Sequence, residues 1–220
     1  MATCDRPIRD RSNHFVITAL SLGIISAVFA IIRLIYKGFF TIAEFGLDDW
    51  FILIALITGL TCCCINVVGV GAYGLGRDVW TLQAAEVTKF VEFFYILEVM
   101  YFAEVALLKL SMLFFFQRIF PGREVRQVIW GTIVFNTLYG LVFVFVAIFQ
   151  CSPVSFYWES WDGEHEGKCV NINALGWANA AISIVLDIWM LAIPLFQLAH
   201  LKLAWKKKVG VALMFGVGTL

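Results

Sequence analysis

The sequence has few charged residues, and the two signs cancel. Only 15% of its 220 residues are charged, and 16 basic residues balance 16 acidic ones, whereas about 25% of the residues in soluble domains are charged. Because a nucleic-acid-binding domain needs a basic surface, the missing positive surplus argues against a nucleic-acid partner. Six cysteines, three of them adjacent, are also too few for a small disulfide-rich secreted domain.

Apolar residues are correspondingly frequent in the sequence. They make up 61% of the chain, against about 45–50% in soluble domains. Such an excess cannot be buried in one water-soluble core, and it also excludes a disordered tail, which requires low hydrophobicity. The sequence therefore predicts an integral membrane protein whose first partner is the lipid bilayer.

The apolar residues form runs of the length that a membrane requires, which is about 20 residues of helix. Strand-like alternation over about ten residues is absent, so we expect an all-α polytopic transmembrane helix bundle. A sixth run, 209–220, is an incomplete span, which suggests a truncated chain or an end held among neighbouring helices. The five complete spans are expected at 15–36, 50–72, 93–116, 130–149 and 175–199.

Basic residues near the span ends indicate orientation, because they concentrate on the cytoplasmic side. The loops after the first, third and fifth spans carry nine basic residues, and the opposite side carries six. We therefore expect an extracellular amino-terminal tail, 1–13, in the plasma membrane. The inner basic loops set the topology or meet a partner or anionic lipid, and contain Arg118, Arg123, Arg126, Lys206, Lys207 and Lys208.

The cysteines test this orientation. Cys151 and Cys169 flank the loop between the fourth and fifth spans, which the topology places outside. In an oxidising compartment they can form a disulfide, although two free thiols remain the alternative. Cys62, Cys63 and Cys64 point to successive faces of a helix and are interpreted as small packing residues.

Ionisable side chains inside the spans are the sharpest clues to function, because they are costly in hydrocarbon. Lys109 in the third span and Asp187 in the fifth differ by about 6 Å in depth at 1.5 Å of rise per residue. A long lysine side chain can cover that gap, so we predict a buried ion pair between them. Asn179, Ser183 and Asp187 follow an i, i+4, i+8 spacing and form a polar stripe toward other helices.

The remaining polar residues of these spans allow three interpretations. Glu98, Tyr101, Glu104 and Asn179 could line an outward-open pocket for a small ligand. The carboxylates could instead relay protons or coordinate a transported ion, or they could simply join the helices. Lys109 as a retinal Schiff base is disfavoured because it lies near the cytoplasmic end of its span.

Signatures of enzymes, cofactors and metals are missing. The glycines from Gly69 to Gly76 end a membrane span instead of following a strand, so they predict no nucleotide site. Asp48 and Asp49 precede the second span and are interpreted as helix caps that favour its positive amino-terminal dipole. The acidic loop around His165 is interpreted as a solvated turn. We expect no enzyme activity, no cofactor and no metal site.

Together these residues resemble a known family, the fungal rhodopsin-domain integral membrane proteins. The resemblance covers about 12–220, and the order and spacing of its motifs carry it more than any single one. The motifs are Arg33, Asp48-Asp49-Trp50, Gly69, Gly71, Gly74-Leu-Gly76, the run 109–120, Phe149-Gln-Cys151-Ser-Pro153, Trp158, Cys169, Asn179, Asp187 and Pro194.

The resemblance implies a seven-helix, receptor-like protein similar to Pth-type G-protein-coupled receptors, with 14–220 as its rhodopsin-like domain. The sequence departs from the pattern in having only part of a sixth span and no seventh. The implied role is to sense a small extracellular ligand or surface cue and to signal to a G protein or another cytoplasmic partner, without retinal. A small-molecule or ion transporter and an accessory membrane protein of a biosynthetic pathway remain the alternatives.

Overall fold

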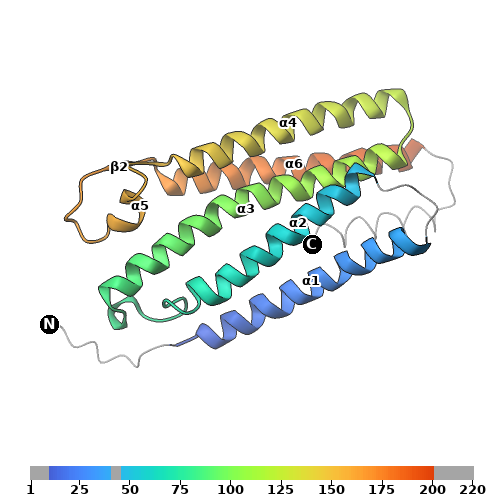
Figure 1. Ribbon diagram of the computed structural model, residues 1–220. Helices are drawn as coiled ribbons and strands as arrows, with labels where there is room; N and C mark the ends of the chain where they lie inside the picture. The colour runs from blue at the N-terminus through green and yellow to red at the C-terminus, as the bar shows by residue number, and fades with distance from the viewer. Residues whose placement is uncertain (1–9, 41–45, 201–220) are drawn as a thin grey trace.

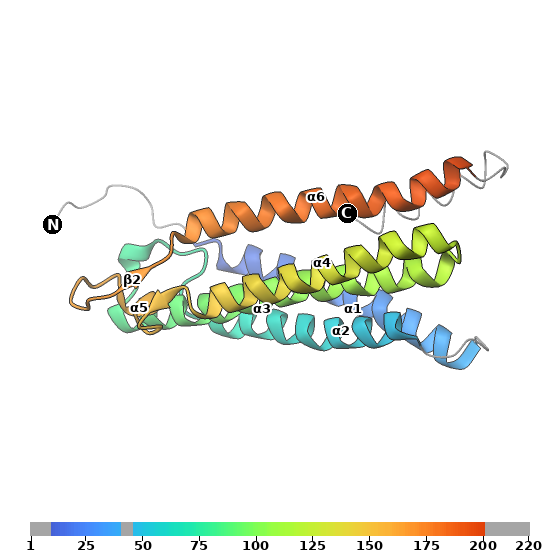
Figure 2. The ribbon, with the colours of Figure 1, turned by 90° about the horizontal axis from the view of Figure 1, so that it is seen from above.

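Five long helices lie side by side with their axes roughly aligned (Figures 1 and 2). The structure, a computed structural model, describes residues 10–40 and 46–200, without the side chains of residues 40 and 198–200. All five helices are long and apolar enough to cross a membrane, which confirms the predicted five spans and the all-α bundle. They are α1 (Ser12–Phe40), α2 (Leu47–Ile65), α3 (Ala84–Ile119), α4 (Arg123–Ile148) and α6 (Ile172–His200).

Two of the predictions fall outside the described residues. The incomplete sixth span at 209–220 lies there, as do Lys206, Lys207 and Lys208 of the last basic loop. The described helices extend beyond the predicted spans at most of their ends, because polar residues of the headgroup region continue the same helices.

The outward faces of the helices are apolar. Ile24 of α1 is 60% exposed and Val185 of α6 is 65% exposed. Surfaces of this kind are unstable in water but fit hydrocarbon, in which a helix needs no polar outer face. The lipid bilayer is therefore the solvent for which this bundle is built.

Helix α3 lies in the middle of the bundle and packs against both α2 and α4. Leu113 and Phe116 of α3 are fully buried and contact Ile129 and Ile133 of α4. Met190 and Ile193 bring α6 into the same cluster. On the other side, Phe51 of α2 stacks on Phe114 with 5.1 Å between ring centroids.

Helices α3 and α4 approach each other closely at Gly140. A Cβ atom added to Gly140 would lie 2.6 Å from the Cβ atom of Ala106, which is too near for any side chain. One turn away, Asn136 donates a hydrogen bond from Nδ2 to the backbone oxygen of Ala106, at 3.0 Å. Small residues at such contacts let helix backbones approach closely in membranes.

The link from α2 to α3 contains the glycine-rich segment. A π-helical turn, η1 (Asn66–Val70), ends the span, and a short 3₁₀ turn, η2 (Val79–Thr81), precedes α3. Gly74 and Gly76 have φ angles of 116° and 84°, which favour glycine. The backbone oxygen of Gly76 accepts a hydrogen bond from Arg11 and so joins this link to the start of α1.

The segment from Phe149 to Asn171, here called the disulfide cap, closes one end of the bundle. Strands β1 (Cys151–Ser152) and β2 (Lys168–Cys169) pair antiparallel, and the predicted Cys151–Cys169 disulfide joins them. Between them lies the short helix α5 (Phe156–Glu159), beside β2 at the end shown on the left of Figure 1. The sequence predicted the disulfide and a solvated acidic turn here but not the helix α5, whose Tyr157 is buried.

The Gly140 contact generates the first testable prediction. Gly140→Ala should lower the free energy of unfolding by about 1–3 kcal/mol, because the added methyl group overlaps Ala106. Unfolding in mixed maltoside and dodecyl sulfate micelles measures this loss. Gly131→Ala on the same helix is the control, since nothing lies within 4 Å of its added Cβ atom. Ala106→Gly should restore stability to Gly140→Ala, and a failure to do so would contradict the contact.

Candidate functional site

The polar side chains of α3 contact a different neighbour at each depth in the bundle. We call one group the outer cluster, which lies under the disulfide cap and contains Tyr95, Glu98, Gln150, Tyr157 and Trp158. We call another the ionic cluster, which lies at the opposite end and contains Arg33, Lys37, Asp48, Asp49 and Arg118. Between them lie the other polar residues that the sequence singled out.

In the outer cluster, Glu98 is the common acceptor. Its Oε2 atom accepts hydrogen bonds from Gln150 Nε2 and from the Tyr157 hydroxyl, each at 3.0 Å. Burial, and then the nearby charge of Glu98, raises the pKa of Tyr157 well above its usual value, so the phenol keeps its proton and donates it. These bonds join α3 to the disulfide cap.

Aromatic rings complete this cluster. The ring centroid of Tyr95 lies 5.1 Å from that of Tyr157 and 5.7 Å from that of Trp158, both in inclined arrangements. The Tyr95 hydroxyl donates to the backbone oxygen of Ile148, at 2.8 Å. The sequence indicated Glu98 but missed its partners, because nothing in the spacing shows how the cap folds back.

Glu104 contacts α2, whereas Lys109 contacts α6 from a different side of α3. Its carboxyl group contacts the hydroxyl of Thr58. The same hydroxyl lies 3.0 Å from the backbone oxygen of Ile54, so its single proton serves one acceptor at a time. Gly59 leaves room beside the carboxyl group, since a Cβ atom there would lie 3.4 Å from Glu104 Oε1.

The two other residues proposed for the ligand pocket have separate surroundings. The side chain of Asn179 on α6 is buried and accepts a hydrogen bond from the Tyr139 hydroxyl of α4. Tyr101 is 56% exposed and its ring lies against Phe102. Within the described residues, the four pocket candidates thus contact different partners, and their joint role in binding a ligand stays a prediction.

Lys109 and Asp187 are brought together. Lys109 Nζ contacts Asp187 Oδ1 and also donates to the backbone oxygen of Ser183, at 3.1 Å. The lysine side chain is 6% exposed, whereas that of Asp187 is 48% exposed. The contact joins α3 to α6 within the hydrocarbon depth, and its contribution to stability stays a prediction.

The ionic cluster joins the ends of three helices. Asp48 is 2% exposed and Asp49 is fully buried at the start of α2. Lys37 of α1 contacts both carboxylates, with 2.9 Å between its Nζ atom and Asp48 Oδ2. Arg33 of α1 and Arg118 of α3 reach Asp48 at 3.4 and 3.6 Å.

This cluster corrects the interpretation of the acidic pair as helix caps alone. Asp49 does cap α2, because its Oδ2 atom accepts a hydrogen bond from the backbone N–H of Gly46 at 2.9 Å. Both carboxylates also neutralise basic residues that the sequence assigned to topology or to contact with a partner or anionic lipid. The basic residues at the ends of the first and third spans were the signal that could have predicted this network.

The acidic tip of the disulfide cap is exposed. The carboxylate of Asp162 lies 3.1 Å from His165 Nδ1. The hydrogen bond that His165 donates to the Asp162 carboxylate, and the charge of that carboxylate, raise the pKa of His165, whereas the backbone N–H of Glu164 donates to Asp162 and lowers its pKa. Across the described residues, no three His, Cys, Asp or Glu side chains lie close enough to hold a metal ion.

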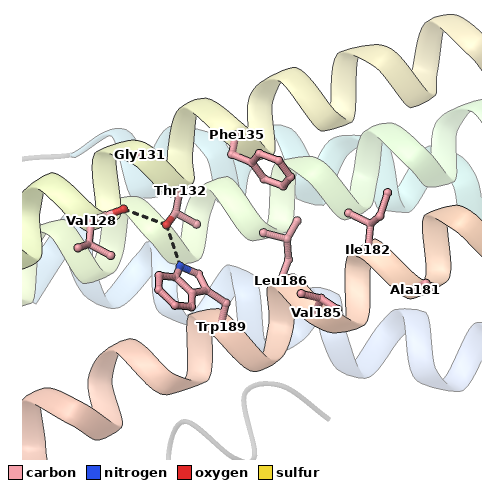
Figure 3. Close-up of a pocket in the computed structure, with 9 residues that line it drawn as sticks. All are labelled: Val128, Gly131, Thr132, Phe135, Ala181, Ile182, Val185, Leu186 and Trp189. Carbon is pink, nitrogen blue, oxygen red and sulfur yellow. Dashed lines mark hydrogen bonds between the residues drawn. The ribbon is translucent and has the colours of Figure 1, made fainter.

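An apolar groove of about 710 Å³ lies between α4 and α6. Figure 3 shows Phe135 and Leu186 along it, with Trp189 and Thr132 near one end. Trp189 Nε1 donates to Thr132 Oγ1 at 3.1 Å, and this hydroxyl donates to the backbone oxygen of Val128 at 2.9 Å. The polar atoms of the groove are thereby paired, which leaves an apolar surface open to lipid. The sequence did not predict it.

Comparison with known proteins agrees with this architecture. A family model described as the fungal rhodopsin domain matches residues 32–220, most of the chain. The chain belongs to the fungal rhodopsin domain family. This confirms the resemblance that the motifs indicated. No solved structure matches the chain.

Curated relatives of this family member are distant in sequence. A SAT4 family membrane protein of Emericella nidulans is 26% identical over 66% of this chain and 38% of its own length. The polyenoic acids biosynthesis gene cluster protein Ba17b of Metarhizium anisopliae is 24% identical over 92% of this chain and 58% of its own length. The fugralins biosynthesis cluster protein 2 of Gibberella zeae is 28% identical over 64% of this chain and 36% of its own length. The chain thus spans less than two thirds of the length of each of them.

The Lys109–Asp187 contact generates a double-mutant prediction. Lys109→Ala leaves Asp187 without its cation in hydrocarbon, where an unpaired charge costs at least about 2.5–3.5 kcal/mol. The Lys109→Ala, Asp187→Ala double variant should therefore be more stable than the sum of the single losses predicts, with a coupling of about 1 kcal/mol or more. Unfolding in mixed micelles gives the four free energies. The exposed Lys89–Glu92 pair is the control, and additive losses at Lys109 and Asp187 would refute the pairing.

The ionic cluster generates another prediction. Asp48→Ala should lower the free energy of unfolding by about 2–3 kcal/mol, because Arg33, Lys37 and Arg118 each lose the carboxylate that they share. Removing one partner of a fully buried pair costs about 3–5 kcal/mol, and the two guanidinium groups here are partly exposed. Thermal unfolding in maltoside micelles measures the loss. Glu124→Ala, an exposed acidic residue in the first turn of α4, is the matched control, and equal stability of the two variants would contradict the cluster.

Proposed function

We propose that this protein is a receptor-like integral membrane protein without enzyme activity. A small extracellular ligand or surface cue acts at the disulfide cap, and α3 carries the resulting change to the ionic cluster. A G protein or another cytoplasmic partner then binds at that end. The observation that carries the proposal is that α3 contacts both regions directly, through Glu98 at one end and Arg118 at the other.

The orientation supports this assignment of the two ends. Disulfides persist in oxidising compartments, so the Cys151–Cys169 bond favours an extracellular cap. The opposite end carries Arg118, Arg123 and Arg126, in agreement with the preference of basic residues for the cytoplasm. We therefore propose a plasma-membrane protein with its amino terminus outside.

The geometry of α3 supports the transmission of a signal. Glu98 and Arg118 are twenty residues apart, which corresponds to about 30 Å of helix. A continuous helix of this length moves as one element, so a shift under the cap displaces Arg118 and Ser111, whose hydroxyl donates to the backbone oxygen of Asp48. Allosteric coupling requires such a two-ended element with contacts at each site.

A second function is favoured by different observations. Two of the relatives are described as biosynthesis cluster proteins, and one of those clusters makes polyenoic acids. The apolar groove between α4 and α6 could hold the hydrophobic product or intermediate of such a pathway. In this alternative the chain is an accessory membrane protein of the pathway, and the two ends of α3 need not be coupled.

Coupling between the ends separates the two functions. Glu98→Gln should weaken the bonds to the cap and thereby increase hydrogen exchange several-fold at backbone amides 47–50, beside the ionic cluster. Hydrogen exchange followed by mass spectrometry of the protein in maltoside micelles measures this.

Glu92→Gln, which removes a carboxylate from the outer part of the same helix, should leave those amides unchanged. If Glu98→Gln alters exchange only in residues 149–171, the receptor proposal is wrong. The outer cluster then serves to hold the cap.

A further inference from the structure

We propose that the outer cluster is a recognition site for an organic ammonium ion. Glu98 neutralises the positive charge of this ligand, and the rings of Tyr95 and Trp158 contact its apolar substituents. The inference names the ligand class of the proposed receptor and in that sense depends on the proposed function. The binding site itself can be tested without any signalling.

The first argument is the charge of Glu98. Asp48, Asp49 and Asp187 each contact a lysine. No described ion pair includes Glu98, whose two donors, Gln150 and Tyr157, are both neutral. A carboxylate removed from water is stabilised best by a cation in addition to hydrogen bonds. The negative charge of Glu98 is therefore not balanced by a cation among the described residues.

The second argument is an acceptor without a donor. Gln150 is 1% exposed, and its Oε1 atom has no hydrogen-bond partner among the described residues. The amide is held beside Glu98 by its own Nε2 atom, so Oε1 lies close to the carboxylate. A buried acceptor left unpaired costs about 1–3 kcal/mol. An N–H or O–H donor on a bound ligand would satisfy it.

The third argument is the aromatic surround. Tyr157, whose hydroxyl donates to Glu98, lies against the ring of Tyr95, and Tyr95 in turn lies against Trp158. Aromatic faces attract ammonium groups, and cages of such rings recognise quaternary ammonium ligands. Tyr157 is buried and bonded to Glu98, whereas Tyr95, Trp158 and Glu98 keep part of their surface exposed. These three side chains are thus accessible to a ligand at the surface, whereas Gln150 is buried and a ligand must enter between them to reach its Oε1 atom.

Glu104 shows why a carboxyl group alone does not make this site. It also lacks a described cation, but it lies deeper in the bundle and its hydrogen-bond partner among the described residues is the hydroxyl of Thr58. Neither aromatic rings nor a second amide accompany it among its described contacts. The combination of charge, acceptor and rings belongs to Glu98.

The field around the site favours the same ligand class. Residues 151–168 carry four carboxylates and a single lysine. An acidic surface at the entrance raises the local concentration of cations and the rate at which they bind. A neutral or anionic ligand would gain nothing from this arrangement.

A matched pair of probes tests the proposal. Choline carries a trimethylammonium group, and 3,3-dimethylbutan-1-ol has the same shape with carbon in place of nitrogen and no charge. Isothermal titration of the purified protein in maltoside micelles, which contain no amine, should show choline binding at least about tenfold tighter than the alcohol. That ratio corresponds to a gain of about 1.4 kcal/mol for the charge.

Two variants assign the binding to the site. Glu98→Gln should weaken choline binding about tenfold or more, to the level of the alcohol, because the charge is lost while the shape is kept. Trp158→Leu should weaken it about three- to thirtyfold through the loss of a cation–π contact. Glu92→Gln, on the same helix, should bind choline as the unchanged protein does. Retention of the Cys151–Cys169 bond and of helical circular dichroism verifies that each variant is folded.

Three results would overturn the proposal: no measurable binding of choline, equal affinity for choline and the alcohol, or unchanged choline binding in folded Glu98→Gln. An infrared band of a protonated carboxyl group that disappears in Glu98→Gln would also overturn it, since a neutral Glu98 needs no cation. Choline binding without coupling to amides 47–50 would retain the site and refute only the receptor. Coupling without choline binding would refute only the ligand class.

Discussion

A polar side chain inside the hydrocarbon core cannot form hydrogen bonds with water, so its partner must lie on a neighbouring helix. In this protein the requirement applies mainly to α3, which carries four acidic or basic side chains from Glu98 to Arg118, each at a different depth. Glu98 meets the disulfide cap, Glu104 meets α2, Lys109 meets α6, and Arg118 meets the start of α2. Each contact fixes one neighbour in rotation and height, and the bundle is arranged around α3 as a result.

The sequence predicts those features that follow from the helical period and from the depth of a residue in the membrane. Apolar runs of the right length give the five spans, and the rise of a helix places Lys109 and Asp187 at similar depths. The same periodicity turns Glu104 away from Lys109 toward a different helix. Cys151 and Cys169 pair because a single loop separates them, so no knowledge of the packing of the spans was needed.

Other features depend on how segments fold back, which no spacing reveals. Tyr157 reaches Glu98, and Trp158 reaches Tyr95, only because the cap forms a hairpin and a short helix over α3. The ionic cluster requires the ends of three separate helices to converge on Asp48, so the acidic pair looked like a simple cap. The groove between α4 and α6 arises from the shapes of two helix faces. In each case the missing information is tertiary.

The hairpin at the base of the disulfide cap has a consequence for how related chains can diverge. Cys151 and Cys169 hold both strands at the neck, and Tyr157 anchors the first part of the cap to the bundle. Trp161 adds a second contact, because its indole N–H donates to Thr88 of α3. The tip from Asp162 to Glu166 makes no described contact with the bundle, and its side chains are exposed. Mutations at the tip can therefore accumulate, and even lengthen it, while the spans keep their positions. Diversity among members of such a family can be concentrated in one small, replaceable surface.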